Sequence, residues 1–199
     1  MISVAIPYHA GMKDADYFID RCIKSVENQK YVDYEIVVTD NPNGWSANHN
    51  EAIKKCKGDI IKFLHMDDFL ENELSLRNIQ NNFGGGWLVT GCTHSRGGGD
   101  RVNEHKPSWN DSMHLGINTI GAPSVLAIEN NNPILFDESM TWLVDCDYYM
   151  RLFRRYGYPH IIPAVNVVIG LHNGQATNII SDERKAQELK LMRERYDTI

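Results

Sequence analysis

Two adjacent carboxylates, Asp67 and Asp68, follow an apolar run in the sequence KFLHMDDFL, and His65 lies two positions before them. Carboxylate oxygens are the ligands that magnesium and manganese prefer, and phosphate oxygens and water complete their shells. Neighbouring side chains of an extended segment point in opposite directions, so we expect only one of the two carboxylates to reach an ion. Two alternatives are that both residues cap a helix beginning near Asn72, or that they are only solvated.

A second acidic pair, Asp145 and Asp147, lies in the sequence VDCDYYMRL. The apolar residues that follow recur at helical spacing, and a helix favours negative charge in its first turn. We therefore expect the pair at the start of a helix that ends at Gly157. This placement would by itself account for both carboxylates.

A further candidate, Asp40, ends the apolar segment YEIVVTD and is followed by NPNG. These residues are typical of a turn, so a purely structural interpretation is sufficient. A carboxylate at the end of a parallel strand also lies where such sheets bind ligands.

The first part of the sequence alternates between short apolar segments and amphipathic ones. This pattern predicts strands and helices over 2–7, 18–26, 34–40, 48–58 and 59–65, beginning with a strand and alternating. Strand and helix in alternation predict a parallel sheet with right-handed crossovers. Because ligands bind at the carboxyl ends of such strands, we expect Pro7, Tyr8, Asp40 and residues 65–68 to converge on one edge.

The rest of the sequence predicts further elements around one long irregular stretch. We expect helices over 72–83 and 145–157, strands over 87–92 and 121–129, a bent pair of strands over 160–172, and a terminal helix capped by Ser181. Residues 93–120 are polar and Gly-rich without a steady period, which is typical of a flexible loop that is functional or disordered.

Composition narrows the possible classes of partner. Lys and Arg total 20 against 26 Asp and Glu in 199 residues, a net charge of −6, so nucleic acid is not expected as a partner. The four cysteines include no C-x-x-C pair, which favours reduced thiols in a cytoplasmic protein. The beginning of the sequence does not read as a signal peptide, and no apolar run approaches the ~20 residues of a transmembrane segment.

The ordered blocks SVAIPYH, YEIVVTDN, NHNEAIKKCKGDIIKFLHMDDF, GAPSVLAIENNNPILFDESMTWLVDCDYYMRLFRRYGY and GLHNGQAT resemble the family-2 glycosyltransferases of GT-A fold. They extend from Ile2 to about Thr177, except across 93–119. The resemblance implies a near-minimal catalytic domain with a single Rossmann-like α/β fold and a mostly parallel central sheet flanked by helices. It divides the domain, 1–199, into a nucleotide-sugar-binding half (1–92), a flexible loop (93–120), an acceptor and catalytic half (121–180) and a terminal helix (181–199).

The resemblance also assigns the donor site. It implies that the nucleotide sugar contacts Pro7, Tyr8, Asp40, Asn50, His65, Met66 and Asp67. A carboxylate at Asp40 accepts the N–H of a uracil-type edge, which favours UDP as the carrier.

The family's D-x-D motif aligns with His65-Met66-Asp67, so Asp67 is the expected ligand of Mn²⁺ or Mg²⁺. His65 departs from the motif: it replaces the first Asp, and its imidazole is expected to bind a ribose hydroxyl or the ion, or to be structural. Asp68 is expected to support the loop. His172 of GLHNGQAT matches a histidine that completes the metal shell or contacts the diphosphate.

Asp145 matches the Asp that deprotonates the acceptor hydroxyl in the family, whereas Asp147 is expected to be structural or to contact substrate. The implied function is a metal-dependent, inverting transfer of a sugar from a nucleotide diphosphate donor to a hydroxyl of a glycan, a lipid-linked or a small-molecule acceptor. Two alternatives stay open. A nucleotidyltransferase would need a Gly-rich basic phosphate loop, of which IPYHAGMKD offers little. A non-catalytic nucleotide- or glycan-binding module of the same fold is the other.

Overall fold

The strands form one sheet in the order β2-β1-β3-β7-β5-β8-β4, with β6 paired to the later part of β5. The computed structural model describes residues 1–97, 99–172 and 180–197. The strands of the sheet are β1 (Ile2–Pro7), β2 (Tyr34–Thr39), β3 (Ile60–Phe63), β4 (Phe69–Leu70), β5 (Trp87–Ser95), β6 (Val102–His105), β7 (Leu126–Glu129) and β8 (His160–Gly170). The helices are α1 (Ala15–Glu27), α2 (Trp45–Lys55), α3 (Ser75–Asn82), α4 (Val144–Tyr156) and α5 (Asp182–Tyr196), with short 3₁₀ turns η1 (Met113–Leu115) and η2 (Pro123–Val125).

The central strand β1 explains why the first part of the sheet is parallel. All six of its residues are buried, and it pairs in parallel with β2 on one side and β3 on the other. A strand covered on both faces needs a continuous apolar run, which ISVAIP provides. The expected strand, helix, strand order is confirmed here.

The second part of the sheet is mixed. β7 runs antiparallel to both β3 and β5, whereas β8 runs parallel to β5 and antiparallel to β4. The predicted α/β class is therefore confirmed, and the mostly parallel arrangement applies to the β2-β1-β3 part. Strand direction after β3 was not evident because no amphipathic helix separates β5 from β7 in the sequence.

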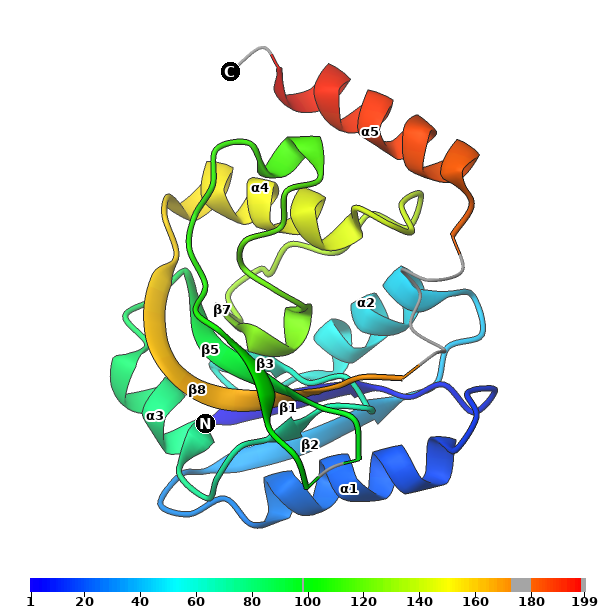
Figure 1. Ribbon diagram of the computed structural model, residues 1–199. Helices are drawn as coiled ribbons and strands as arrows, with labels where there is room; N and C mark the ends of the chain where they lie inside the picture. The colour runs from blue at the N-terminus through cyan, green and yellow to red at the C-terminus, as the bar shows by residue number, and fades with distance from the viewer. Residues whose placement is uncertain (98, 173–179, 198–199) are drawn as a thin grey trace.

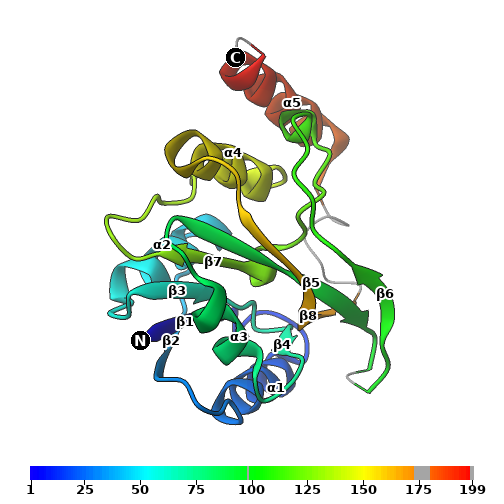
Figure 2. The same cartoon turned by 90° about the vertical axis from the view of Figure 1, so that its left-hand side faces the viewer.

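The helices form layers on the two faces of the sheet. In Figures 1 and 2, α1 and α3 cover one face and α2 and α4 lie over the other, with α5 beyond α4. The largest fully buried side chains include Trp87, Tyr148 and Tyr149, so the aromatic core lies between β5 and α4. Among the described residues, no helix is both long and apolar enough to cross a bilayer.

Residues 93–120 are more structured than expected. β5 continues to Ser95, the edge strand β6 pairs with it, and η1 follows. The Asp100 carboxylate accepts the N–H groups of Arg96 and Gly97 and the Ser95 hydroxyl, which orders the turn between the strands. The sequence did not indicate these elements because an exposed polar edge strand such as VNEH lacks hydrophobic alternation.

The predicted bent pair of strands over 160–172 is one continuous strand. β8 curves around the sheet (Figure 1), and its register against β5 shifts on both sides of Gly91. A Cβ at Gly91 would lie 2.5 Å from the Pro163 carbonyl oxygen, so only glycine allows this close approach. Pro163 therefore lies within one bent element.

Candidate active site

The carboxyl ends of the three parallel strands meet as expected. The Tyr8 N–H donates to the Thr39 carbonyl oxygen at 2.7 Å, which joins the end of β1 to the end of β2. The His9 N–H donates to the Met66 sulfur at 3.2 Å, which joins the β1 loop to the turn after β3. Asp40 is exposed at the same edge. This edge therefore brings together most of the candidate donor-binding residues.

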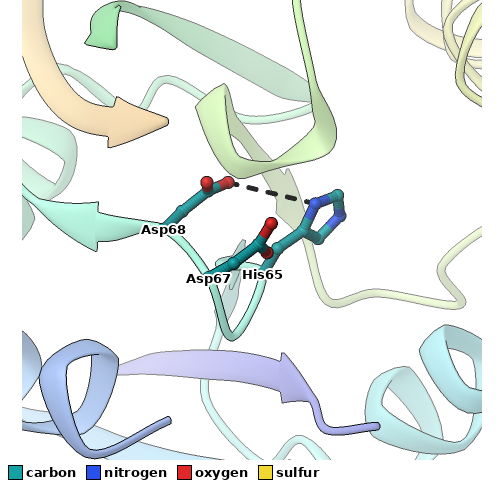
Figure 3. A group of neighbouring side chains, drawn as sticks. All are labelled: His65, Asp67 and Asp68. Atoms are coloured by element: carbon teal, nitrogen blue, oxygen red, sulfur yellow. Dashed lines mark ion pairs between the residues drawn. The ribbon is translucent and has the colours of Figure 1, made fainter. Parts of the chain in front are cut away.

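The segment after β3 is a tight turn and not an extended chain. The Asp68 N–H donates to the His65 carbonyl oxygen at 3.0 Å. The turn brings ligand atoms of His65, Asp67 and Asp68 within 4.8 Å of one another, and Figure 3 shows the three side chains gathered on it. The expectation that adjacent carboxylates point apart was wrong, because it assumed extended backbone.

Asp67 is held as an ionised carboxylate. Its Oδ2 lies 2.8 Å from His172 Nε2, and the side chains of both residues are less than one-fifth exposed. Burial by itself raises the pKa of Asp67, but the hydrogen bond from His172 brings this pKa below its usual value. The same hydrogen bond raises the pKa of His172. The structure thus brings together the two residues expected to bind metal, although they lie 105 positions apart in the chain.

Asp68 performs a different task. Its Oδ1 accepts the Gly170 N–H at 2.8 Å, and its Oδ2 lies 3.9 Å from His65 Nδ1. The side chain is 2% exposed, and this burial, with the charge of Asp67, raises its pKa well above the usual value. Asp68 therefore ties the turn to the end of β8, as expected for a residue that supports the loop.

His65 is a neutral imidazole beside these carboxylates. Burial lowers its pKa to about 4. Its Nε2 is buried and has no hydrogen-bond partner among the described residues. A neutral ring with an unpaired nitrogen is suited to bind a hydroxyl or a cation.

His49 is a neighbour of His65 that sequence reasoning missed. The two rings meet edge to face with centroids 5.1 Å apart, and Trp45 stacks on His49 at 3.5 Å. Its Nδ1 lies 2.8 Å from the Trp45 carbonyl oxygen, whereas its Nε2 has no partner in the described part of the chain. The available signal was the four-residue spacing of Trp45 and His49, which places both on one face of α2.

The residues around the turn fit a divalent cation. Asp67 supplies an ionised carboxylate, His65 directs its Nδ1 toward the carboxylates, 3.9 Å from Asp68 Oδ2, and His172 already contacts Asp67. A mixed oxygen and nitrogen donor set suits manganese better than magnesium, which takes oxygen ligands almost alone.

Asp145 lies in the first turn of α4. Its Oδ2 accepts from Asn118 Nδ2 at 2.7 Å, and its Oδ1 accepts the Cys146 N–H at 2.8 Å. Burial raises its pKa to about 6, although both hydrogen bonds favour the ionised form. A carboxylate that titrates near neutral pH is suited to accept a proton.

Asn118 is a second residue that sequence reasoning missed, and it links the two acidic groups. Its Oδ1 accepts the N–H groups of Ile120 and Gly121, which closes a turn. Six positions along the chain, the Ser124 hydroxyl accepts the His65 N–H at 2.9 Å and bonds to Asp68. Residues 118–124 therefore connect Asp145 to the turn after β3. An isolated asparagine in an irregular stretch gives no signal of such a role.

Two other candidate site residues, Asn50 and Asp147, make structural contacts. The Asn50 side chain is 2% exposed, donates to the Phe136 carbonyl oxygen and to Glu138, and accepts the Phe136 N–H at 2.7 Å. We therefore do not retain Asn50 in the donor site. Asp147 is fully buried and pairs with Arg151 and Arg195, which is consistent with the expected structural role.

The described fold is of the GT-A type found in glycosyltransferases. A crystal structure of residues 1–349 of TarS from S. aureus in complex with UDP-GlcNAc aligns with a TM-score of 0.73 at 15% identity, over 97% of this chain and 65% of that chain. The mannosyltransferase PcManGT from Pyrobaculum calidifontis, in complex with GDP-Man and Mn²⁺, aligns with a TM-score of 0.67 at 14% identity, over 100% and 64%. At these identities the likeness concerns the fold.

Comparison of the sequence itself with known proteins is less informative than comparison of the fold. The uncharacterised protein MT1568 of Mycobacterium tuberculosis is 26% identical, over 78% of this chain and 62% of that protein. No protein-family model matches the chain. The chain thus spans somewhat less than two-thirds of the length of the relatives named first in each comparison.

Proposed function

We propose that the protein is a metal-dependent, inverting glycosyltransferase that uses a nucleotide diphosphate sugar. The observation that carries the proposal is that two different groups of side chains are connected. His65, Asp67 and Asp68 form one group, Asp145 is the other, and residues 118–124 connect them. Sugar transfer needs these two functions, charge neutralisation at the leaving diphosphate and a base at the acceptor. Nucleotide sugars bound to TarS and PcManGT, on the same fold, support this proposal.

The donor is proposed to bind across the ends of β1, β2 and β3. Pro7 and Tyr8 line the base, and the exposed Asp40 carboxylate accepts an N–H of the base. UDP is the preferred carrier because a uracil edge offers one such N–H between two carbonyl groups. The diphosphate then lies toward Met66 and Asp67, with His65 available to a ribose hydroxyl.

Asp67 is proposed to hold the cation, with His172 and His65 as additional ligands. Bound Mn²⁺ or Mg²⁺ would supply positive charge that stabilises the departing diphosphate. Without it, the ion pair of Asp67 and His172 keeps the carboxylate ionised and fixes its direction.

Asp145 is proposed to take the proton of the acceptor hydroxyl as its oxygen bonds to the anomeric carbon. The bond from that carbon to the diphosphate oxygen breaks, its electron pair leaves with the nucleotide diphosphate, and the proton stays on Asp145. Attack opposite the leaving group inverts the anomeric centre. Asn118 holds the carboxylate during this step, since its amide donates to Oδ2.

The acceptor is proposed to be a hydroxyl of a glycan, a lipid-linked compound or a small molecule. A cytoplasmic location is proposed because Cys22, Cys56, Cys92 and Cys146 are all free thiols.

A thermal-shift panel of nucleotide sugars with and without Mn²⁺ tests the donor and the metal together. A ligand that binds only the native state raises its apparent stability, so we expect UDP-sugars to raise the melting temperature most in the presence of Mn²⁺. Donors that stabilise the protein would then be incubated with an acceptor panel, and the anomeric configuration of the product would be assigned by NMR. Retention of configuration would contradict the single displacement.

A non-catalytic nucleotide- or glycan-binding module is the second candidate, because His65 stands where the D-x-D pattern has an acid. It predicts stabilisation by UDP with neither transfer nor slow donor hydrolysis. Hydrolysis of a UDP-sugar that is lost in Asp145→Asn would exclude it.

A further inference from the structure

Helix α5 buries one face, and this face includes a carboxylate. Glu188 is 2% exposed and shares a face with Met192 and Tyr196, at four-residue spacing. In Figures 1 and 2, α5 lies beyond α4 as seen from the sheet, so this face packs toward the start of α4. A charged side chain is buried only where it is fully hydrogen-bonded.

The partners of Glu188 are three consecutive backbone groups immediately before α4. Its Oε1 accepts the Thr141 N–H at 2.7 Å, and its Oε2 accepts the N–H groups of Trp142 and Leu143 at 2.8 Å each. These N–H groups belong to the segment that leads into α4, and no side chain at Leu143 caps the helix. Glu188 therefore satisfies, from another helix, the backbone from which α4 begins.

Arg184 holds Glu188 in this position. Its Nε donates to Glu188 Oε1 at 2.7 Å, and its Nη2 donates to the Ser139 carbonyl oxygen and lies 3.3 Å from Thr141 Oγ1. The guanidinium of Arg184 thus joins the Glu188 carboxylate to the segment before α4 that this carboxylate contacts. Both ends of the contact are fixed by charge-assisted hydrogen bonds.

A second contact from α5 lies on the other side of Asp145. Asp147 Oδ1 accepts from Arg195 Nη1 at 2.9 Å and from the Tyr196 hydroxyl at 2.8 Å. Asp145 lies between this contact and the one at residues 141–143. The backbone that carries Asp145 is therefore fixed from α5 on both sides.

We propose that Glu188 is a positioning residue for Asp145: it sets the placement of the first turn of α4, and thereby of the carboxylate that accepts the acceptor proton. This inference rests on the proposed function for the role of Asp145. Glu188 acts through the N–H groups of Thr141, Trp142 and Leu143 and has no part in donor binding.

The test is Glu188→Gln, with Glu194→Gln as the matched control. Glu194 lies on the same helix and is 61% exposed. The introduced side-chain amide offers one acceptor oxygen and no charge, so the three N–H groups lose part of their hydrogen bonding. We expect kcat to fall about 10- to 100-fold, because a misplacement of about 1 Å costs rate without weakening binding. The donor dissociation constant stays within about twofold, and the acid limb of the kcat profile moves to lower pH as Asp145 becomes more solvated.

Two further measurements keep the test decisive. Amide hydrogen exchange at Thr141, Trp142 and Leu143 is expected to accelerate in Glu188→Gln and not in Glu194→Gln. If Glu188→Gln does not fold, Arg184→Gln leaves the carboxylate in place without its restraint and is expected to reduce kcat less, again at constant donor affinity.

A folded Glu188→Gln protein with wild-type kcat would overturn the inference, as would a loss of donor affinity equal to the loss in kcat. Absence of transfer and of donor hydrolysis in the wild-type protein would instead contradict the proposed function. Hydrogen exchange would still test the inference in that case, because it requires no turnover. Unchanged exchange at Thr141, Trp142 and Leu143 in Glu188→Gln would show that Glu188 does not hold the start of α4.

Discussion

Asp67 and Asp145 are both partly buried, yet they differ in electrostatic behaviour. Asp67 contacts the imidazole of His172, and its pKa lies below the usual value. Asp145 contacts the neutral amide of Asn118 and a backbone N–H, and its pKa rises to about 6. Burial raises the pKa of either group, so the charge of the partner decides the outcome. One carboxylate is kept ionised, and the other is left able to exchange a proton.

The two carboxylates also differ in what holds their backbone. The turn with Asp67 lies at the end of a strand, where Arg21 donates to the Asp67 carbonyl oxygen and the Gly170 N–H bonds to Asp68. Asp145 lies on a helix that is held by residues 118–124 and by Glu188 from α5. The turn with Asp67 is thus held mainly by the ends of strands and by Ser124, whereas the proposed base, Asp145, is held by residues 118–124 and by α5.

The largest expected effect comes from removing the proton acceptor. Asp145→Asn keeps the shape, leaves one acceptor oxygen for its two donors and cannot accept a proton, so we expect kcat to fall by about 10²- to 10⁴-fold. Affinity for a UDP-sugar, measured by calorimetry with Mn²⁺, should stay within about twofold. The control is Asp182→Asn, a fully exposed carboxylate on α5. An equal loss of donor affinity in Asp145→Asn would remove the distinction between the two sites.

The second largest effect is expected from a change at Asp67, the ionised partner of His172. Asp67→Asn removes the charge that would hold the cation, so we expect metal-dependent affinity for UDP to fall about 10- to 100-fold. Titrations of UDP with and without Mn²⁺ measure this difference directly. Asp33→Asn, at a position away from the turn, is the control. If Asp67→Asn binds UDP and Mn²⁺ as the wild type does, the ion is held elsewhere.

Much of the proposed donor side could be predicted because its signals are local. The buried run of β1 and the turn residues after β2 and β3 are contiguous in sequence, and parallel topology places their ends together. The close contact of Asp67 with His172 needed a resemblance, since 105 positions separate them and periodicity carries no information over that distance.

The support of Asp145 could not be predicted for the same physical reason. Asn118 lies in a stretch without period, and Glu188 is one of several charged residues on a helix whose pattern indicates solvation. Its burial depends on N–H groups 45 to 47 positions earlier in the chain. Conversely, Asn50 was assigned to the donor by resemblance, but its contacts with Phe136 make it part of the core.

A smaller effect should follow from crowding the turn without changing its charges. A Cβ at Gly170 would collide with the Asp67 carbonyl oxygen, so Gly170→Ala must displace the turn or the end of β8. We expect metal-dependent UDP affinity to fall about tenfold with kcat changed less, because the disturbance lies on the side of Asp67. Gly11→Ala is the control, since its Cβ meets no atom within 4 Å. A fall in kcat at saturating donor with unchanged affinity would show that the two sites are not separately supported.

The smallest effect concerns the titration of Asp145. A base works only when ionised, so the rate should fall as the pH decreases through the pKa of about 6. The Asn118 amide stabilises the ionised form, and its loss in Asn118→Ala should raise the pKa by about one unit, since such a hydrogen bond is worth about 1.5 kcal/mol. The acid limb of kcat then moves to higher pH and the rate at pH 7 falls about twofold. Asn28→Ala, at an exposed position, should leave the profile unchanged. A limb that stays in place would mean that Asn118 does not influence the pKa of Asp145, and the contrast with Asp67 would then depend on the contact of Asp67 with His172.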